Sequence, residues 1–143
     1  MESVSLESAL PSGHGEHILF VDDEPGICHL AEIVFEQIGY RVTAHTNPEE
    51  ALLQFREAPD RFALVVSNLA MPRLTGVELA QEILQLRPRI PILLVTDFSS
   101  DWTLDRLREF GIRDLIAKPM TLGELTTAVH RLLYANGERG ANL

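Results

Sequence analysis

The chain has 143 residues, of which 45% are hydrophobic, and it carries a formal net charge of −9 with a pI near 4.9. This length and composition support one domain with a real core, and the negative charge argues against a general binder of nucleic acid or anionic membranes. No apolar stretch approaches the roughly 20 residues that span a bilayer, and the polar N-terminus does not resemble a secretory signal. The single Cys28 cannot form an internal disulfide, so we expect an acidic cytoplasmic protein.

Apolar runs alternate with amphipathic stretches along the chain. Five short apolar runs predict strands, at 17–21, 40–45, 62–67, 90–96 and 113–117. The stretches after them predict helices, at 25–39, 47–57, 75–86, 100–111 and 121–135. Because the strands are almost continuously apolar and each precedes a helix, we expect an α/β fold, with a doubly wound parallel sheet covered on both faces.

The chain ends differ from this pattern in composition. Residues 1–15 are rich in Ser, Gly and Glu and lack periodicity, so we expect a flexible leader there,. Residues 16–135 form the expected domain, and residues 136–143 a flexible tail.

Several residues mark where the helices begin and which side they bury. Thr75 with Glu78, and Thr121 with Glu124, have the spacing of capping boxes,. The apolar positions expected on one face of the first helix are Ile27, Ala31, Val34 and Ile38,.

Polar side chains follow four of the predicted strands, at the sheet edge where ligands bind in such folds. They are Asp22 and Asp23, Asn68, Thr96, and Lys118 followed by Pro119. Paired carboxylates suit a hard cation such as Mg²⁺, which takes oxygen ligands and often binds beside phosphate. Structural roles are also open, since either Asp could cap the helix at Pro25 and the others could simply end their strands. Their coincidence at one edge favours a metal- or phosphate-binding site.

In order and spacing, these motifs resemble the receiver domain of two-component response regulators. The resemblance covers residues 16–135 and rests on "ILFVDDE", "LVVSNLAMPRLTG", "ILLVT" and the Lys-Pro pair at 118–119. It implies a flavodoxin-like sheet with strand order 2-1-3-4-5. It also implies a bacterial phosphorelay, in which the partner is a histidine kinase or a downstream signalling protein.

The resemblance implies roles for single residues as well. Residue 68 is normally an aspartate that accepts a phosphoryl group from the kinase, so it is the phosphoacceptor position, and no conventional catalytic residue is expected. The other implied roles are metal binding by Asp22, Asp23, Asn68 and the Ala70 backbone carbonyl, phosphoryl binding by Thr96 and Lys118, and a conformational switch at position 115.

Asn68 departs from this pattern. Attack on phosphorus needs an ionised oxygen, whereas an amide offers a neutral carbonyl oxygen and an NH₂ donor. We therefore expect no acyl phosphate, weakened Mg²⁺ binding, and an amide that bridges a carboxylate and Lys118. Two further departures affect signalling: Asp97 stands where the family usually has a small residue, and Leu115 where it usually has an aromatic switch.

Three interpretations stay open. The first is a receiver-like interaction module, a pseudo-receiver, which acts through a protein partner or as a piece of a larger hybrid protein, with no direct contact to nucleic acid or membrane. The second is an ordinary phosphoacceptor in which Asn68 is a laboratory replacement for Asp. The third is a Mg²⁺-dependent phosphohydrolase. Phosphohydrolases that resemble this chain use an aspartate nucleophile at the end of the first strand and carry a second aspartate two residues later. This chain has Glu24 at the second place, so the match is poor.

Overall fold

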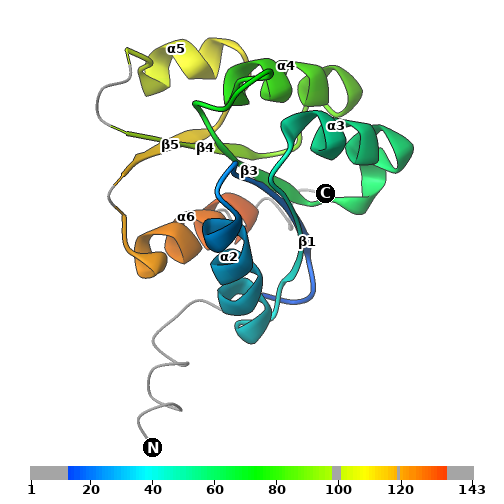
Figure 1. Cartoon of the computed structure of the whole chain (residues 1–143), viewed down its shortest axis with the longest axis vertical. Helices are drawn as coiled ribbons and strands as arrows, with labels where there is room; N and C mark the ends of the chain where they lie inside the picture. Colours follow the sequence, from blue (N-terminus) through cyan, green and yellow to red (C-terminus); the bar gives the residue numbers. More distant parts are fainter. Residues whose placement is uncertain (1–12, 98–100, 119, 135–143) are drawn as a thin grey trace, which may run out of the picture.

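The computed structural model describes residues 13–97, 101–118 and 120–134. Five parallel strands form one sheet in the order β2-β1-β3-β4-β5 (Figure 1). The strands are β1 (His17–Val21), β2 (Arg41–His45), β3 (Leu64–Asn68), β4 (Ile92–Thr96) and β5 (Asp114–Ala117). The predicted fold class and strand order are confirmed.

Helices cover both faces of the sheet. They are α2 (Pro25–Gln37), α3 (Pro48–Glu57), α4 (Gly76–Leu86), α5 (Leu104–Glu109) and α6 (Leu122–Tyr134), with a short 3₁₀ turn, η1 (Pro59–Arg61). Helices α3, α4 and α5 pack on one face, and α2 and α6 on the other (Figure 1).

The sheet separates two hydrophobic cores. Adjacent residues of a strand point to opposite faces, so in β1 Leu19 packs under α3 and α4 while Ile18 and Phe20 pack under α2 and α6. Because both faces are covered, the three central strands β1, β3 and β4 are buried and apolar over most of their length, which explains why the sequence shows continuous apolar runs there rather than alternation,.

The predicted capping boxes are present. The Thr75 hydroxyl accepts a hydrogen bond from the Glu78 N–H (3.2 Å), and the Glu78 carboxylate accepts one from the Thr75 N–H (2.9 Å). Thr121 and Glu124 make the same exchange at 3.0 and 2.8 Å. These bonds satisfy N–H groups that have no partner within the helix.

Two local predictions were wrong in detail. Ala31 and Ile38 are buried as predicted, but Ile27 and Val34 are only partly buried. Cys28 and Phe35 are buried in their place, so the buried face of α2 is rotated from the predicted one. Helix α5 begins at Leu104 rather than at 100, because the Thr103 hydroxyl accepts from the Arg106 N–H and caps the helix there.

Most of the predicted leader (1–12), all of the predicted tail (136–143), and Pro119 after Lys118 lie outside the described residues. Within the described range, Gly13 and Gly15 donate hydrogen bonds to the carbonyl oxygens of Ile38 and Gly39. No helix among the described residues is both long and apolar enough to traverse a lipid bilayer.

Candidate functional site

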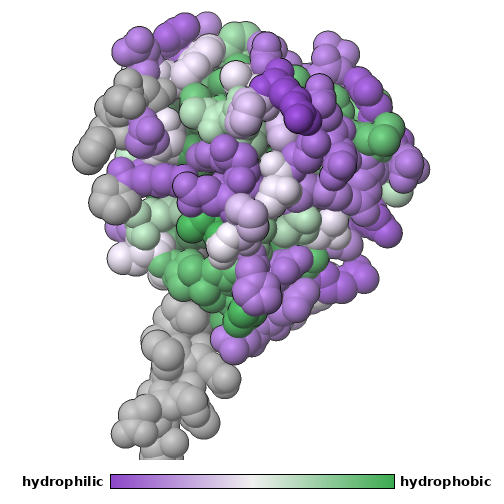
Figure 2. Space-filling model, viewed as in Figure 1, coloured by the Kyte–Doolittle hydropathy of each residue, from purple (hydrophilic) through white to green (hydrophobic). Residues whose placement is uncertain are grey.

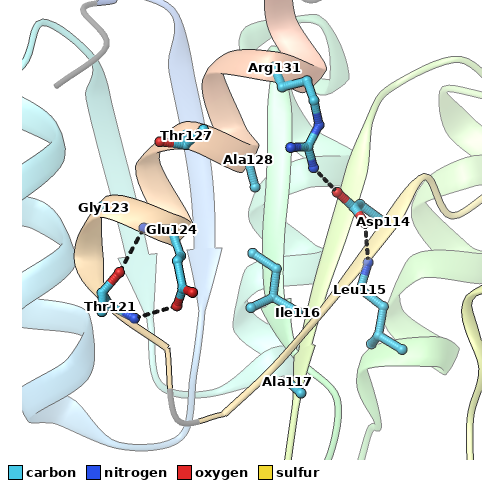
Figure 3. A pocket seen from close by; sticks show the side chains of 10 residues that line it. All are labelled: Asp114, Leu115, Ile116, Ala117, Thr121, Gly123, Glu124, Thr127, Ala128 and Arg131. Carbon is cyan, nitrogen blue, oxygen red and sulfur yellow. Dashed lines mark hydrogen bonds and ion pairs between the residues drawn. The ribbon is translucent and has the colours of Figure 1, made fainter.

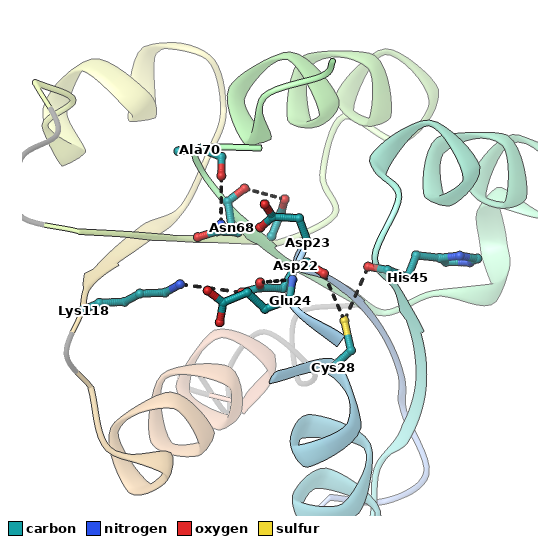
Figure 4. Close-up of polar contacts among 9 residues, drawn as sticks. Asp22, Asp23, Glu24, Cys28, His45, Asn68, Ala70 and Lys118 are labelled. Carbon is teal, nitrogen blue, oxygen red and sulfur yellow. Dashed lines mark hydrogen bonds and ion pairs between the residues drawn. The ribbon is translucent and has the colours of Figure 1, made fainter. Parts of the chain in front are cut away.

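The strand register brings the predicted site residues to one edge of the sheet. Val21 pairs with Ser67, Asn68 with Val95, and Thr96 with Ala117, so the strands end at nearly the same level. The residues at or just after these ends therefore gather above the sheet (Figure 4).

Asp22 is the buried carboxylate of the site, with only 3% of its surface exposed. One of its oxygens accepts a hydrogen bond from the Glu24 N–H (2.9 Å), and the other lies 3.7 Å from the Lys118 ammonium nitrogen. Burial raises the pKa of Asp22, while the Glu24 N–H and the Lys118 charge act in the opposite direction,. The residue at the N-cap of α2 is Glu24, without a side-chain bond, so neither aspartate caps that helix.

Asn68 connects the loop after β1 to the loop after β3. Its Nδ2 donates to Asp23 Oδ1 at 3.3 Å and to the Ala70 carbonyl oxygen at 3.0 Å (Figure 4). The predicted bridge from Asn68 to a carboxylate is therefore present, but its second end is wrong, because Lys118 pairs with Asp22 and Asn68 pairs with Ala70. The site therefore contains two neighbouring polar pairs, Asn68 with Asp23 and Lys118 with Asp22.

The donor arrangement decides which groups a cation would meet at this site. The family pattern assigns the oxygens of Asp23 and Ala70 to a metal ion. Both oxygens accept hydrogen bonds from the Asn68 NH₂ group. The part of the chain that the structure describes contains no group of three or more His, Cys, Asp or Glu side chains that could hold a metal ion. A cation between these oxygens would meet NH₂ hydrogens instead of a third anionic oxygen.

Thr96 and Asp97 lie at the end of β4, whereas Leu115 lies within β5. Thr96 is 6% exposed and its hydroxyl donates to the Asp97 carbonyl oxygen (3.1 Å). Leu115 is partly buried against the core under α3, α4 and α5, and Asp97 is exposed. Ser67 is buried, and its hydroxyl donates to the Asn68 carbonyl oxygen (2.9 Å), so it does not point out beside Asn68.

Sequence reasoning missed two residues that hold the site in place. The Cys28 thiol donates to the Asp22 carbonyl oxygen (3.2 Å) and to the His45 carbonyl oxygen (3.5 Å), which ties the site loop to β2. Burial raises the pKa of Cys28 to about 11, so the thiol keeps its proton. Gly76 begins α4 directly against the end of β3, and its N–H donates to the Leu69 carbonyl oxygen (2.8 Å). The available signals were the position of Cys28 in the helix after Asp22 and the Thr75-Gly76 pair.

A separate open groove of about 710 Å³ lies between β5 and α6 (Figure 3). Leu115 lines it, together with an ion pair between Asp114 and Arg131 (2.5 Å) and the Thr121 cap of α6. Of the predicted site residues, the groove includes the switch position rather than the metal or phosphoryl positions.

Comparison with solved structures identifies the class of protein. A receiver domain from Clostridium thermocellum superposes with a TM-score of 0.79 over 86% of this chain and 98% of the other, at 23% identity, which establishes the shared fold. Response regulator TrrA of Thermotoga maritima, solved in complex with Mg²⁺ and BeF, is 30% identical with a TM-score of 0.71 over 82% of this chain and 99% of the other. The fold is that of signalling receiver domains.

The chain belongs to the response regulator receiver domain family, whose model matches residues 18–130. It is 33% identical over 126 residues to the transcriptional regulatory protein ZraR of Salmonella typhimurium, covering 88% of this chain and 28% of ZraR. It is 38% identical over 121 residues to the probable transcriptional regulator ycf27 of Pyropia yezoensis, covering 82% of this chain and 47% of the relative. These relatives are longer proteins, of which the chain matches a half or less.

Proposed function

We propose that this receiver domain is a pseudo-receiver, a protein-interaction module of a two-component system that does not accept phosphate at its central position. One observation carries the proposal: Asn68 ends β3, where the family pattern has its phosphoacceptor, and its NH₂ is hydrogen-bonded to Asp23 and Ala70. A neutral amide has no anionic oxygen to attack phosphorus, and its oxygen is a poorer ligand for Mg²⁺ than a carboxylate. Magnesium binding is accordingly weaker than in a receiver such as TrrA.

The surroundings of Asn68 support a domain held in one state. The Lys118 ammonium nitrogen is 3.7 Å from the buried Asp22 carboxylate. The Thr96 hydroxyl donates a hydrogen bond to the Asp97 carbonyl oxygen. In the family pattern both groups bind phosphoryl oxygens. Leu115, at the switch position, packs against the core and carries no ring that could turn inward. Asp97 adds a carboxylate directly after Thr96, which would repel an incoming phosphoryl group.

The proposed partner is another signalling protein, either a histidine kinase or a downstream component. Figure 2 shows hydrophobic surface over α2 and the neighbouring part of α6. Leu30 and Ile33 on α2 are 42% and 43% exposed, and Leu122 at the start of α6 is 38% exposed. Exposed aliphatic side chains of this kind provide apolar contact area for a protein partner. The domain would act through this contact, alone or within a longer protein like its relatives.

The proposal is tested by treating the protein with acetyl phosphate and Mg²⁺ and measuring its intact mass. We expect no phosphoryl addition to the chain with Asn68, because the residue at the acceptor position is an amide. Asn68→Asp, treated in parallel, restores the carboxylate and is expected to gain one phosphoryl group.

Peptide fragmentation then locates any added mass. A phosphoryl group on residue 68 of the unaltered chain would refute the proposal. In Asn68→Asp, we expect a smaller conformational change on phosphorylation than in receivers with an aromatic switch, because Leu115 and Asp97 remain. Amide chemical shifts over β5 and α6 measure that change, and a large shift there would show that these two departures do not matter.

A further inference from the structure

The Asn68 amide lies between two oxygens that the family pattern assigns to a metal ion. Its Nδ2 is 3.3 Å from Asp23 Oδ1 and 3.0 Å from the Ala70 carbonyl oxygen (Figure 4). A carboxylate oxygen and a backbone carbonyl oxygen can only accept hydrogen bonds. The group between them must therefore be a donor, so the chemistry itself orients the NH₂, and not the amide oxygen, toward both.

This NH₂ makes the same connection that a bound cation would make. It carries partial positive charge, contacts an anionic oxygen and a carbonyl oxygen, and links the loop after β1 to the loop after β3. Asp22, the other carboxylate, already lies 3.7 Å from the Lys118 ammonium group. Asp22 and Asp23 thus each have a positively charged or positively polarised partner within the chain.

We infer that the Asn68 amide replaces the cation of this site, so that Mg²⁺ and the NH₂ group compete for the oxygens of Asp23 and Ala70. The inference rests on the proposed function and gives it a cause: the loops keep their arrangement without metal. It differs from the simpler view that Asn68 is a weak ligand, because a weak ligand assists the metal, whereas a competing donor opposes it.

The two views predict opposite effects of Asn68→Ala. This variant removes the amide without adding charge and leaves Asp22, Asp23 and the Ala70 carbonyl in place. If the NH₂ competes with the metal, Asn68→Ala binds Mg²⁺ roughly 2- to 10-fold more tightly than the chain with Asn68, the factor that one ordinary hydrogen bond represents. If Asn68 is a ligand, Asn68→Ala binds more weakly. Titration calorimetry with Mg²⁺ alone measures both affinities, and equal or weaker binding would overturn the inference.

A matched control keeps the result specific to this site. Asp23→Asn in the Asn68→Ala background removes the carboxylate that the metal would use, so the gain in affinity is expected to disappear. A gain that persists would place the metal elsewhere and overturn the inference.

A second measurement needs no variant. As Mg²⁺ is titrated into the Asn68 chain, competition predicts that the Asn68 side-chain NH₂ signals move toward those of a solvent-exposed amide, because the metal frees the NH₂ from Asp23 and Ala70. NH₂ signals that keep their hydrogen-bonded shifts while Mg²⁺ binds at Asp23 would contradict the inference. If Mg²⁺ binds through Asn68 but no phosphoryl group is gained, the inference fails and the proposed function stands. If residue 68 is phosphorylated while Asn68→Ala still binds Mg²⁺ more tightly, only the proposed function fails.

Discussion

Gly76 lets α4 begin in contact with the strand that carries Asn68, and Gly76→Ala is expected to disturb both fold and site. A Cβ added at Gly76 would fall far inside van der Waals contact with the Asn68 carbonyl oxygen and only 2.9 Å from the Leu69 Cα. Both neighbours are backbone atoms, which cannot turn aside as a side-chain tip can. The end of β3 or the start of α4 must therefore move.

The expected cost follows from this overlap. Overpacking by one methyl group in a tight position costs about 1–3 kcal/mol. Because the atoms in the way belong to the backbone, Gly76→Ala lies at the upper end of this range, about 3 kcal/mol,. Alanine's better helix propensity returns up to about 1 kcal/mol, which leaves a net loss of stability of about 2–3 kcal/mol. For a domain of this size, that loss lowers the melting temperature by about 6–15 °C. Thermal unfolding followed by circular dichroism gives the value.

Gly26→Ala is the matched control. Gly26 lies in the first turn of α2, and a Cβ added there would meet nothing within 4 Å. We expect Gly26→Ala to leave the melting temperature unchanged or to raise it slightly, since only helix propensity changes. The Asn68 side-chain NH₂ signals are expected to shift in Gly76→Ala and not in Gly26→Ala. Equal stability of the two variants would refute the reasoning about close backbone contact.

Two further predictions concern the charges of the site. Asn68→Asp exchanges the hydrogen bond to Asp23 for repulsion between neighbouring carboxylates. Water around the exposed Asp23 screens this repulsion, so urea unfolding without metal is expected to show a loss of about 1–2 kcal/mol in the free energy of unfolding. Mg²⁺ is expected to restore this stability, and equal stability of the two proteins in metal chelator would contradict the argument. Because burial raises the pKa of Asp22, the folded protein binds this proton more readily than the unfolded chain, and stability falls as pH rises through the folded-state pKa. Asp22→Asn is therefore expected to reduce this fall in stability and to be more stable than the unsubstituted chain at neutral pH, although the pairing with Lys118 is lost. If the free energies of unfolding of the two proteins change in parallel from acidic to neutral pH, this explanation is excluded.

Local patterns were sufficient to predict the fold. Five apolar runs, each followed by a helical pattern, gave the strands and helices, and the family motifs gave the order 2-1-3-4-5 found in the structure. The capping boxes at Thr75 and Thr121 were equally readable, because a cap involves residues only three apart,. The predicted ends of helices and strands were less accurate. The start of α5, for example, depends on one capping hydroxyl, that of Thr103, and nearby residues of the sequence could also begin a helix.

The amino-acid sequence by itself determined which chemical groups reach the carboxyl edge of the sheet, including the amide at position 68, since strand alternation and chain order fix that placement. Only the tertiary structure decided how those groups pair. Asn68 contacts Asp23, 45 residues away in the chain, and Lys118 lies next to Asp22 rather than next to Asn68. Such pairings depend on differences of a few ångströms between loops that belong to different strands. A pattern in a linear sequence carries no record of these distances, because they result from the packing of the whole domain.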